Sequence, residues 1–159
     1  MAEVSIRRAT PADIPFLRRM QWEGLLASPQ FIAALGLEAL RATEERYWAA
    51  WPPPDEVAFV AEDAQGQPLG AVILKVHERD GERVVGYRLA IGVEAQVRGR
   101  GIGRQLLERA KAYSRDAGVD YLLLLVDPTN APALHAYHAT GFQLGDPHGV
   151  VPMIARFTD

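Results

Sequence analysis

The chain has 159 residues, a formal net charge of −3 and no cysteine, and 48% of its residues are hydrophobic. This length predicts one domain over residues 1–159, and the lack of a signal-peptide pattern or a membrane-length apolar run predicts a cytoplasmic protein with no membrane partner. The acidic balance disfavours nucleic-acid binding, and the missing cysteines exclude disulfides, cysteine metal ligands and a cysteine nucleophile.

The first third of the chain is expected to be a short strand followed by two helices. Residues 4–8 alternate in polarity, and Thr10-Pro11-Ala12-Asp13 is typical of a helix N-terminus. This helix should end near Ser28-Pro29, and the next should run from Phe31 to about Ala49, before the prolines that follow Trp51. We interpret the aromatic residues here as core: Trp22, Phe31, Tyr47, Trp48 and Trp51. The adjacent acids Glu44 and Glu45 are expected on a solvated helix face.

The sequence pattern in the middle of the chain predicts an antiparallel meander. Strands are predicted at 57–62 and 69–76, with a turn between them. Asp80-Gly81 indicates a second hairpin turn. The strand after it, 84–93, is almost continuously apolar, which is typical of a buried strand.

A glycine-rich loop follows that strand, with Gly99, Gly101 and Gly103 at alternate positions and Arg98, Arg100 and Arg104 between them. Glycine lets backbone N–H groups approach a ligand closely, and the N-terminus of the following helix attracts anions. The loop therefore predicts a phosphate or pyrophosphate site. It matches neither the dinucleotide fingerprint nor a P-loop, so a nucleotide-binding module is disfavoured.

The last third alternates helices and strands. A helix is expected from Ile102 to about Ala117, ended by Gly118, and a strand at 121–126 should run parallel to the strand before the loop. Asn130 is placed to cap a helix over 131–140 that Gly141 closes. Two final strands are expected at 142–144 and 150–157.

The helix at 131–140 carries a second pattern, Asn-x-x-Ala-x-x-x-Tyr-x-x-x-Gly-Phe, from Asn130 to Phe142. This pattern and the segment from Val93 to Gly103 together resemble the GCN5-related N-acetyltransferase (GNAT) superfamily. The resemblance implies an α/β (α+β) fold, in which a mixed, mostly antiparallel sheet with one splayed parallel strand pair is flanked by helices. It also implies acetyl-CoA as co-substrate and direct acetyl transfer to a primary amine of a small molecule or a protein.

The resemblance assigns the cofactor-binding residues. Backbone groups of Ile91 and Val93 would pair with the pantetheine arm, Asn130 would contact it, and N–H groups from Arg98 to Arg104 would hold the pyrophosphate. The cofactor-binding set is Ile91, Val93, Arg98, Gly99, Arg100, Gly101, Ile102, Gly103, Arg104, Asn130 and Tyr137. Tyr137 is the candidate catalytic acid, because a phenol can protonate a departing thiolate without being ionised at neutral pH.

The general base is not fixed by these patterns. The glutamate that histone-acetylating relatives carry falls on Val85 here. Glu82, Tyr87, His77, Glu78 and a water relay remain alternatives, and the water relay is preferred. A non-catalytic acetyl-CoA-binding domain is the alternative function, and a homodimer is possible.

His135 and His138 lie three residues apart, as some metal ligands do. No third ligand is spaced to join them, so we expect no metal.

Overall fold

The computed structural model describes residues 3–26, 32–33, 35–53, 56–78, 85–126, 131–144 and 151–157. Within these residues, the strands form one sheet in the order β1-β2-β3-β4-β5-β7-β6. The strands are β1 (Ser5–Arg8), β2 (Val57–Glu62), β3 (Pro68–Glu78), β4 (Val85–Val93), β5 (Tyr121–Val126), β6 (Gln143–Leu144) and β7 (Val151–Arg156). All paired neighbours are antiparallel except β4 and β5, which are parallel.

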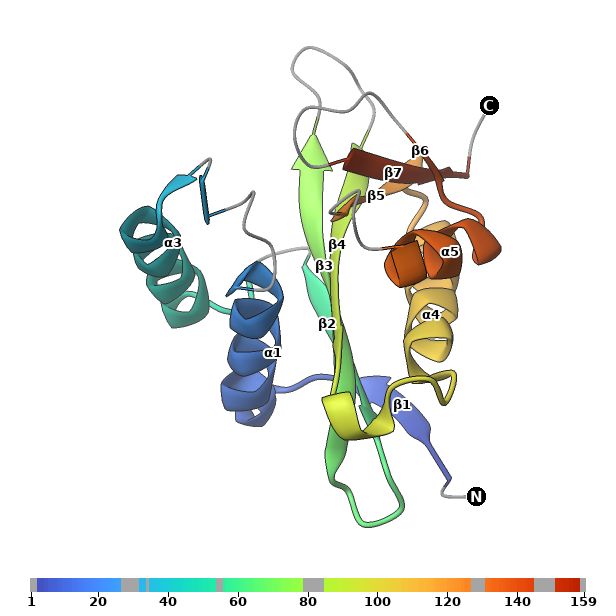
Figure 1. The fold of residues 1–159 in the computed structure, drawn as a ribbon, viewed down its shortest axis with the longest axis horizontal. Coiled ribbons are helices and arrows are strands. Elements are labelled where there is room, and N and C mark those ends of the chain that lie inside the picture. Colours follow the sequence, from blue (N-terminus) through green and yellow to red (C-terminus); the bar gives the residue numbers. More distant parts are fainter. Residues whose placement is uncertain are drawn as a thin grey trace.

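Helices cover both faces of this sheet (Figure 1). They are η1 (Pro11–Asp13), α1 (Ile14–Leu26), α3 (Leu37–Ala49), η2 (Ala95–Val97), α4 (Ile102–Asp116) and α5 (Ala131–Ala139). α1 and α3 lie on one face, and α4 and α5 lie on the other (Figure 1). None of the described helices is long and apolar enough to cross a bilayer. The predicted fold class, a mixed and mostly antiparallel sheet flanked by helices, is confirmed.

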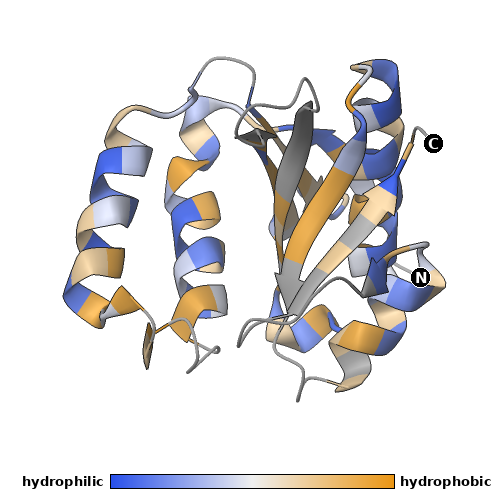
Figure 2. Ribbon diagram, turned by 90° about the horizontal axis from the view of Figure 1, so that it is seen from above, coloured by the Kyte–Doolittle hydropathy of each residue, from blue (hydrophilic) through white to orange (hydrophobic). Residues whose placement is uncertain are grey.

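Apolar side chains of the strands are buried on both faces, because each face meets a helical layer. Figure 2 shows hydrophobic stretches of the central strands between these layers. Along β2, Val57 and Phe59 belong to the core under α4, whereas Ala58 and Val60 belong to the core under α1 and α3. Gly70 shows how closely α4 packs on the sheet, since a Cβ there would lie 3.2 Å from Leu106 Cδ1 of α4. The buried meander therefore holds β4 between two cores.

The predicted helix start at Thr10 is confirmed. The carboxylate of Asp13 accepts the backbone N–H of Thr10 at 2.8 Å, and η1 leads directly into α1. Arg7 donates to both oxygens of the same carboxylate at 2.8 Å. This guanidinium holds the pKa of Asp13 below its usual range.

The helix predicted from Phe31 to Ala49 is divided in the structure: residues 32–33 and 35 are helical, and the helix is interrupted at Gly36. α3 begins at Leu37, after Gly36 with φ of +80°, a backbone conformation that interrupts a right-handed helix. Phe31, Ser28 and Pro29 lie outside the described residues, as do Asp80 and Gly81 of the predicted hairpin turn.

The prediction of a solvated Glu44 is wrong. Its residue is only 8% exposed, while Glu45 is exposed as expected. The Glu44 carboxylate accepts Trp48 Nε1–H at 2.8 Å and the side-chain amide of Gln21 from α1. It is therefore a buried acceptor that joins α1 to α3.

Replacing Glu44 with alanine should lower the free energy of unfolding by about 2–3 kcal/mol. Trp48 Nε1–H and the Gln21 amide would lose their acceptor within the buried layer, and buried donors without partners are costly. Urea unfolding of Glu44→Ala beside Glu45→Ala measures the effect, because the exposed neighbour should change stability by about 0.5 kcal/mol or less. Equal losses in both variants would show that the carboxylate of Glu44 contributes nothing specific.

Candidate active site

The parallel pairing of β4 with β5 is short. Residues 86–88 of β4 pair with residues 121–123 of β5, and along the described backbone of these two strands no pair forms beyond Arg88 and Leu123. β4 nevertheless continues to Val93, and it pairs with β3 along that whole length. Residues 89–93 of β4 therefore have one edge that β5 does not pair.

The backbone alternation decides which groups face this edge. Glu94 N–H donates to the Leu69 carbonyl oxygen of β3 at 2.8 Å. Since hydrogen-bonded positions alternate along an antiparallel pair, the N–H and C=O groups of Ile91 and Val93 point away from β3, toward the side of β5. An extended ligand could pair with these two residues as an added strand.

The glycine loop connects this edge to α4. Gly99 and Gly101 have φ of +79° and +82°, and a Cβ at either position would meet nothing within 4 Å. Both glycines are therefore needed for the backbone conformation, and the space beside them is open. Gly103 lies inside α4, where a Cβ would make only an ordinary contact, 3.7 Å from Val93 Cγ2.

The N-terminus of α4 lies at the end of this loop and has no side-chain cap, because Gly101 occupies the cap position. The first N–H groups of α4, including those of Ile102 and Gly103, have no partner inside the helix and carry its positive dipole end. Open space, left-handed glycines and an uncapped helix start fit a diphosphate.

Three arginines surround the loop, and all three are exposed. Arg98 Nε–H donates to the Val93 carbonyl oxygen at 3.0 Å, which ties the loop back to the edge of β4. Arg100 and Arg104 flank the α4 N-terminus in sequence. The loop thus combines backbone donors with positive charge, the usual components of a phosphate site.

Tyr137 lies on α5, which shares a sheet face with α4 (Figure 1). Its ring packs edge-on against Phe142, with 6.1 Å between ring centroids, and it borders the same apolar core as Ile91 and Val93. Burial raises the pKa of Tyr137 above its ordinary value. The phenol therefore remains a proton donor at neutral pH.

Several expected site residues lie outside the described part of the chain. Asn130 and Glu82 are not described, and the side chains of His77, Glu78 and Tyr87 are not described either. The register alone places Val85 opposite Glu78 and Tyr87 opposite Val76. The choice among these bases therefore stays a prediction.

A buried polar cluster on the other sheet face was not anticipated as such. The Tyr47 hydroxyl, Trp51 Nε1 and one Glu56 carboxylate oxygen are buried, and none makes a hydrogen bond of good geometry among the described residues. Burial raises the pKa of Tyr47, and the carboxylates of Glu56 and Glu44 raise it further. The spacing of Glu44, Tyr47 and Trp48 at i, i+3 and i+4 is the sequence signal that places them on one face of α3, and Trp51 lies just beyond the end of that helix.

This buried polar cluster lies near the place in the sheet where β5 stops pairing with β4. Lys75 Nζ is 4.0 Å from the centroid of the Tyr47 ring, and Lys75 pairs in register with Arg88, the last β4 residue that β5 pairs. Directly after β4, Glu94 forms an ion pair with Arg19 of α1, and this pair holds α1 near the start of the glycine loop. Sequence reasoning missed both contacts, since they join residues distant in the chain.

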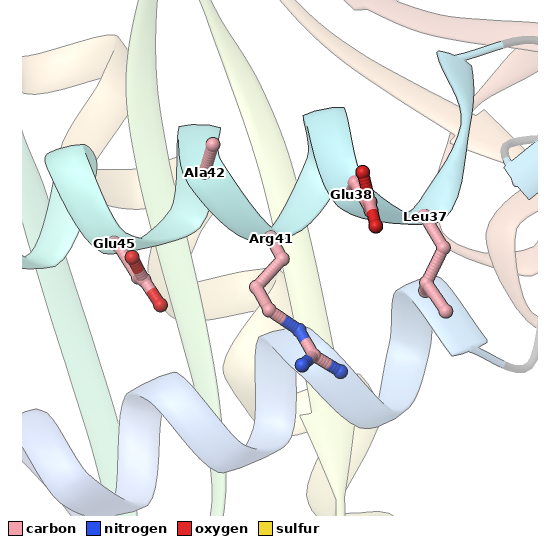
Figure 3. Close-up of a pocket in the computed structure, with 5 residues that line it drawn as sticks. All are labelled: Leu37, Glu38, Arg41, Ala42 and Glu45. Atoms are coloured by element: carbon pink, nitrogen blue, oxygen red, sulfur yellow. The ribbon is translucent and has the colours of Figure 1, made fainter.

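The hollow on α3 is a surface feature rather than a second site (Figure 3). All five residues that line it come from this one helix and are exposed: Leu37, Glu38, Arg41, Ala42 and Glu45. His135 and His138 are exposed as well, and no group of three potential metal ligands occurs among the described residues.

Comparison with known sequences gives a family match. A family model described as "Acetyltransferase (GNAT) family" matches residues 20–142. A mycothiol acetyltransferase of Rhodococcus jostii is 42% identical over 108 residues, which cover 65% of this chain and 34% of that protein. The chain thus spans about a third of the length of this relative.

Solved structures share the fold over nearly the whole chain. The PaiA N-acetyltransferase of Thermoplasma acidophilum, solved with coenzyme A, has a TM-score of 0.72 at 19% identity and covers 98% of this chain and 99% of its own. A chimera of the Vibrio cholerae spermidine N-acetyltransferase SpeG and hSSAT has a TM-score of 0.70 at 25% identity and covers 96% and 95%.

Proposed function

The chain belongs to the acetyltransferase (GNAT) family, and on that premise we propose that it transfers an acetyl group from acetyl-CoA directly to a primary amine. The observation that carries the proposal is the junction of β4, the glycine loop and α4. It offers a backbone edge at Ile91 and Val93 that β5 does not pair, two left-handed glycines and an uncapped helix start within one continuous segment. The chain's residues fit a thioester cofactor with a diphosphate.

Binding is the first task of these residues. The backbone of Ile91 and Val93 pairs with the pantetheine arm, and N–H groups from Arg98 to Arg104 hold the diphosphate. Asn130 contacts the pantetheine side, as the family resemblance implies. Acetyl-CoA supplies the activated acetyl group.

The transfer forms one bond and breaks another. The amine nitrogen forms a bond to the thioester carbonyl carbon, the C–S bond breaks, and the sulfur leaves with the bonding electron pair. Tyr137 donates its phenolic proton to that sulfur, while an N–H near Val93 polarises the carbonyl oxygen. The amine loses its proton to water, so no buried side-chain base is needed, and the Tyr137 phenolate takes a proton back from water before the next turnover.

The acceptor is a small-molecule amine. Support comes from the names of two similar proteins, a mycothiol acetyltransferase and a spermidine N-acetyltransferase. We place the acceptor on the α1 and α3 face of β4, because α4 and α5 cover the face that carries Tyr137. A non-catalytic acetyl-CoA-binding domain is not favoured, since binding alone gives no reason for a buried phenol that borders the same core as Ile91 and Val93.

A thiol-release assay tests the function. The chain with acetyl-CoA should release coenzyme A when polyamines, amino acids, aminoglycosides or peptides are added in turn, and acetyl-CoA should raise the unfolding temperature while ATP and NAD do not. Heat protection by acetyl-CoA without thiol release from any amine would favour the non-catalytic alternative. Absence of both effects would refute the proposal.

Ionisation of Tyr137 should not lower kcat at any pH below ~10. Burial raises the pKa of Tyr137 above the ordinary tyrosine value of 10.0, so the phenol keeps its proton until the pH passes that raised value. The same shift makes the folded chain bind this proton more tightly than the unfolded chain. The linked stability is present below pH ~10 and declines above it.

Measuring kcat at saturating amine from pH 7 to about pH 10.5 checks this expectation. An alkaline limb with an apparent pKa well below the ordinary value of tyrosine, abolished in Tyr137→Phe, would contradict it.

A further inference from the structure

The C-terminal end of α5 is fixed by a dense set of hydrogen bonds around Tyr137. The carbonyl oxygen of Tyr137 accepts N–H groups of Thr140 at 3.1 Å and Phe142 at 3.0 Å. The hydroxyl of Thr140 lies 3.0 Å from the same oxygen and 3.0 Å from the Ala136 carbonyl oxygen. The turn from Thr140 to Phe142 therefore determines where the last turn of α5, and with it Tyr137, is held.

One charged side chain from α4 binds this turn. Lys111 Nζ donates to the carbonyl oxygen of Thr140 at 2.7 Å, and the Lys111 side chain is only 12% exposed. Nζ would lie 3.4 Å from a Cβ at Gly141, a glycine with φ of +94°. The missing side chain at Gly141 thus leaves room for the ammonium group.

The Thr140 carbonyl is the main partner of Lys111. The carboxylate of Glu108 is 4.0 Å away and half exposed, so it makes a weak, solvent-screened pair. A cation at a helix C-terminus also interacts favourably with the dipole and satisfies a carbonyl that has no partner inside the helix. Lys111 therefore acts mainly on the end of α5.

This bond connects the two halves of the proposed site. α4 begins at the glycine loop that would hold the diphosphate, whereas α5 carries the phenol that would protonate the thiolate. The two groups are supplied by separate segments, and their relative position decides whether the phenol reaches the sulfur. α5 has only 9 residues, so its own backbone bonds constrain it weakly.

We propose that Lys111 is a positioning residue that sets the place of Tyr137 relative to the diphosphate loop, an inference that rests on the proposed acetyl transfer. Removing the ammonium frees the end of α5 and misplaces the phenol, while the loop and the open edge of β4 stay intact. Since misplacement of a reacting group by about 1 Å can cost roughly 10²-fold, the effect falls on kcat rather than on cofactor binding.

A double-mutant cycle tests this role. Lys111→Met should lower kcat by about tenfold and change KM for acetyl-CoA by about twofold or less. In a Tyr137→Phe background, the same substitution should lower kcat little further, because the group that Lys111 positions is already gone. Lys111→Arg keeps a cation that can donate to the Thr140 carbonyl, and it should recover most of the activity.

Glu108→Gln is the matched control, since it removes the exposed partner of Lys111 and keeps the bond to Thr140. It should leave kcat unchanged. If Lys111→Met slowed Tyr137→Phe by the same factor as it slows the wild-type chain, or left wild-type kcat intact, the positioning role would be refuted. A general loss of the fold would raise KM and lower the unfolding temperature in all Met variants alike, and that outcome also overturns the inference. A wild-type chain that releases no thiol with any amine would instead refute the proposed function, and with it this role.

Discussion

Replacing Tyr137 with phenylalanine is expected to lower kcat by roughly 10²–10⁴-fold while the affinity for coenzyme A stays similar. The substitution removes one oxygen and keeps the ring that packs on Phe142. The departing thiolate would then lack its proton donor, and water would have to replace a phenol that burial keeps protonated. Steady-state kinetics of thiol release, with coenzyme A affinity from thermal shift, measures both quantities.

Tyr113→Phe is the matched control for this loss. Tyr113 is also a half-buried tyrosine, and its ring packs on Phe59 at 5.5 Å, but it has no part in the proposed site. We expect its kcat to stay near the wild-type value. Full turnover in Tyr137→Phe would show that the phenol is not the acid, even if the chain proves to be an acetyltransferase.

The helices and strands could be predicted from the sequence where a property of the segment itself determines its structure. β2 lies at 57–62 as its apolar run predicts, and α4 begins at Ile102 directly after a left-handed glycine. Gly118 ends that helix with φ of +76°, as its position predicts. In each case the deciding property, burial on both faces or a positive φ, belongs to the segment itself.

The errors arise where a segment distant in the chain determines the surroundings of a residue. Glu44 looks solvated beside Glu45, but Gln21 of α1 packs against it and makes it a buried acceptor. The bond between Lys111 and Thr140 joins residues 29 apart, and the residues next to either one in the sequence do not predict it. Family patterns miss such contacts as well, because they report the residues that meet the cofactor.

The proposed site also has parts that the sequence predicts and parts that it does not. The glycine loop is visible in the sequence because its conformation needs glycine at two positions, 99 and 101. The open edge of β4 is not visible there, because it depends on how far β5 follows β4, and pairing ends at Arg88. The acceptor side that we propose depends on α1, α3 and β3 together, so no short pattern describes it.

The glycine loop gives the second large expected effect. Gly101→Ala should weaken coenzyme A binding by at least about tenfold, which corresponds to about 1.4 kcal/mol. Alanine is strained at a φ of +82°, so the loop would shift, and the new Cβ would enter the open space where the diphosphate is expected. Titration of the unfolding temperature with coenzyme A measures the loss.

Gly66 separates backbone strain from ligand binding. It has nearly the same φ, +79°, and the same open surroundings, but it lies in the turn between β2 and β3. Gly66→Ala should therefore lose a similar amount of stability without ligand, about 1 kcal/mol, and keep the full stabilisation by coenzyme A. Because the two variants share the strain and differ in the loop, a difference in ligand response can come only from the diphosphate site. An equal response to coenzyme A in both would mean that the cofactor binds elsewhere.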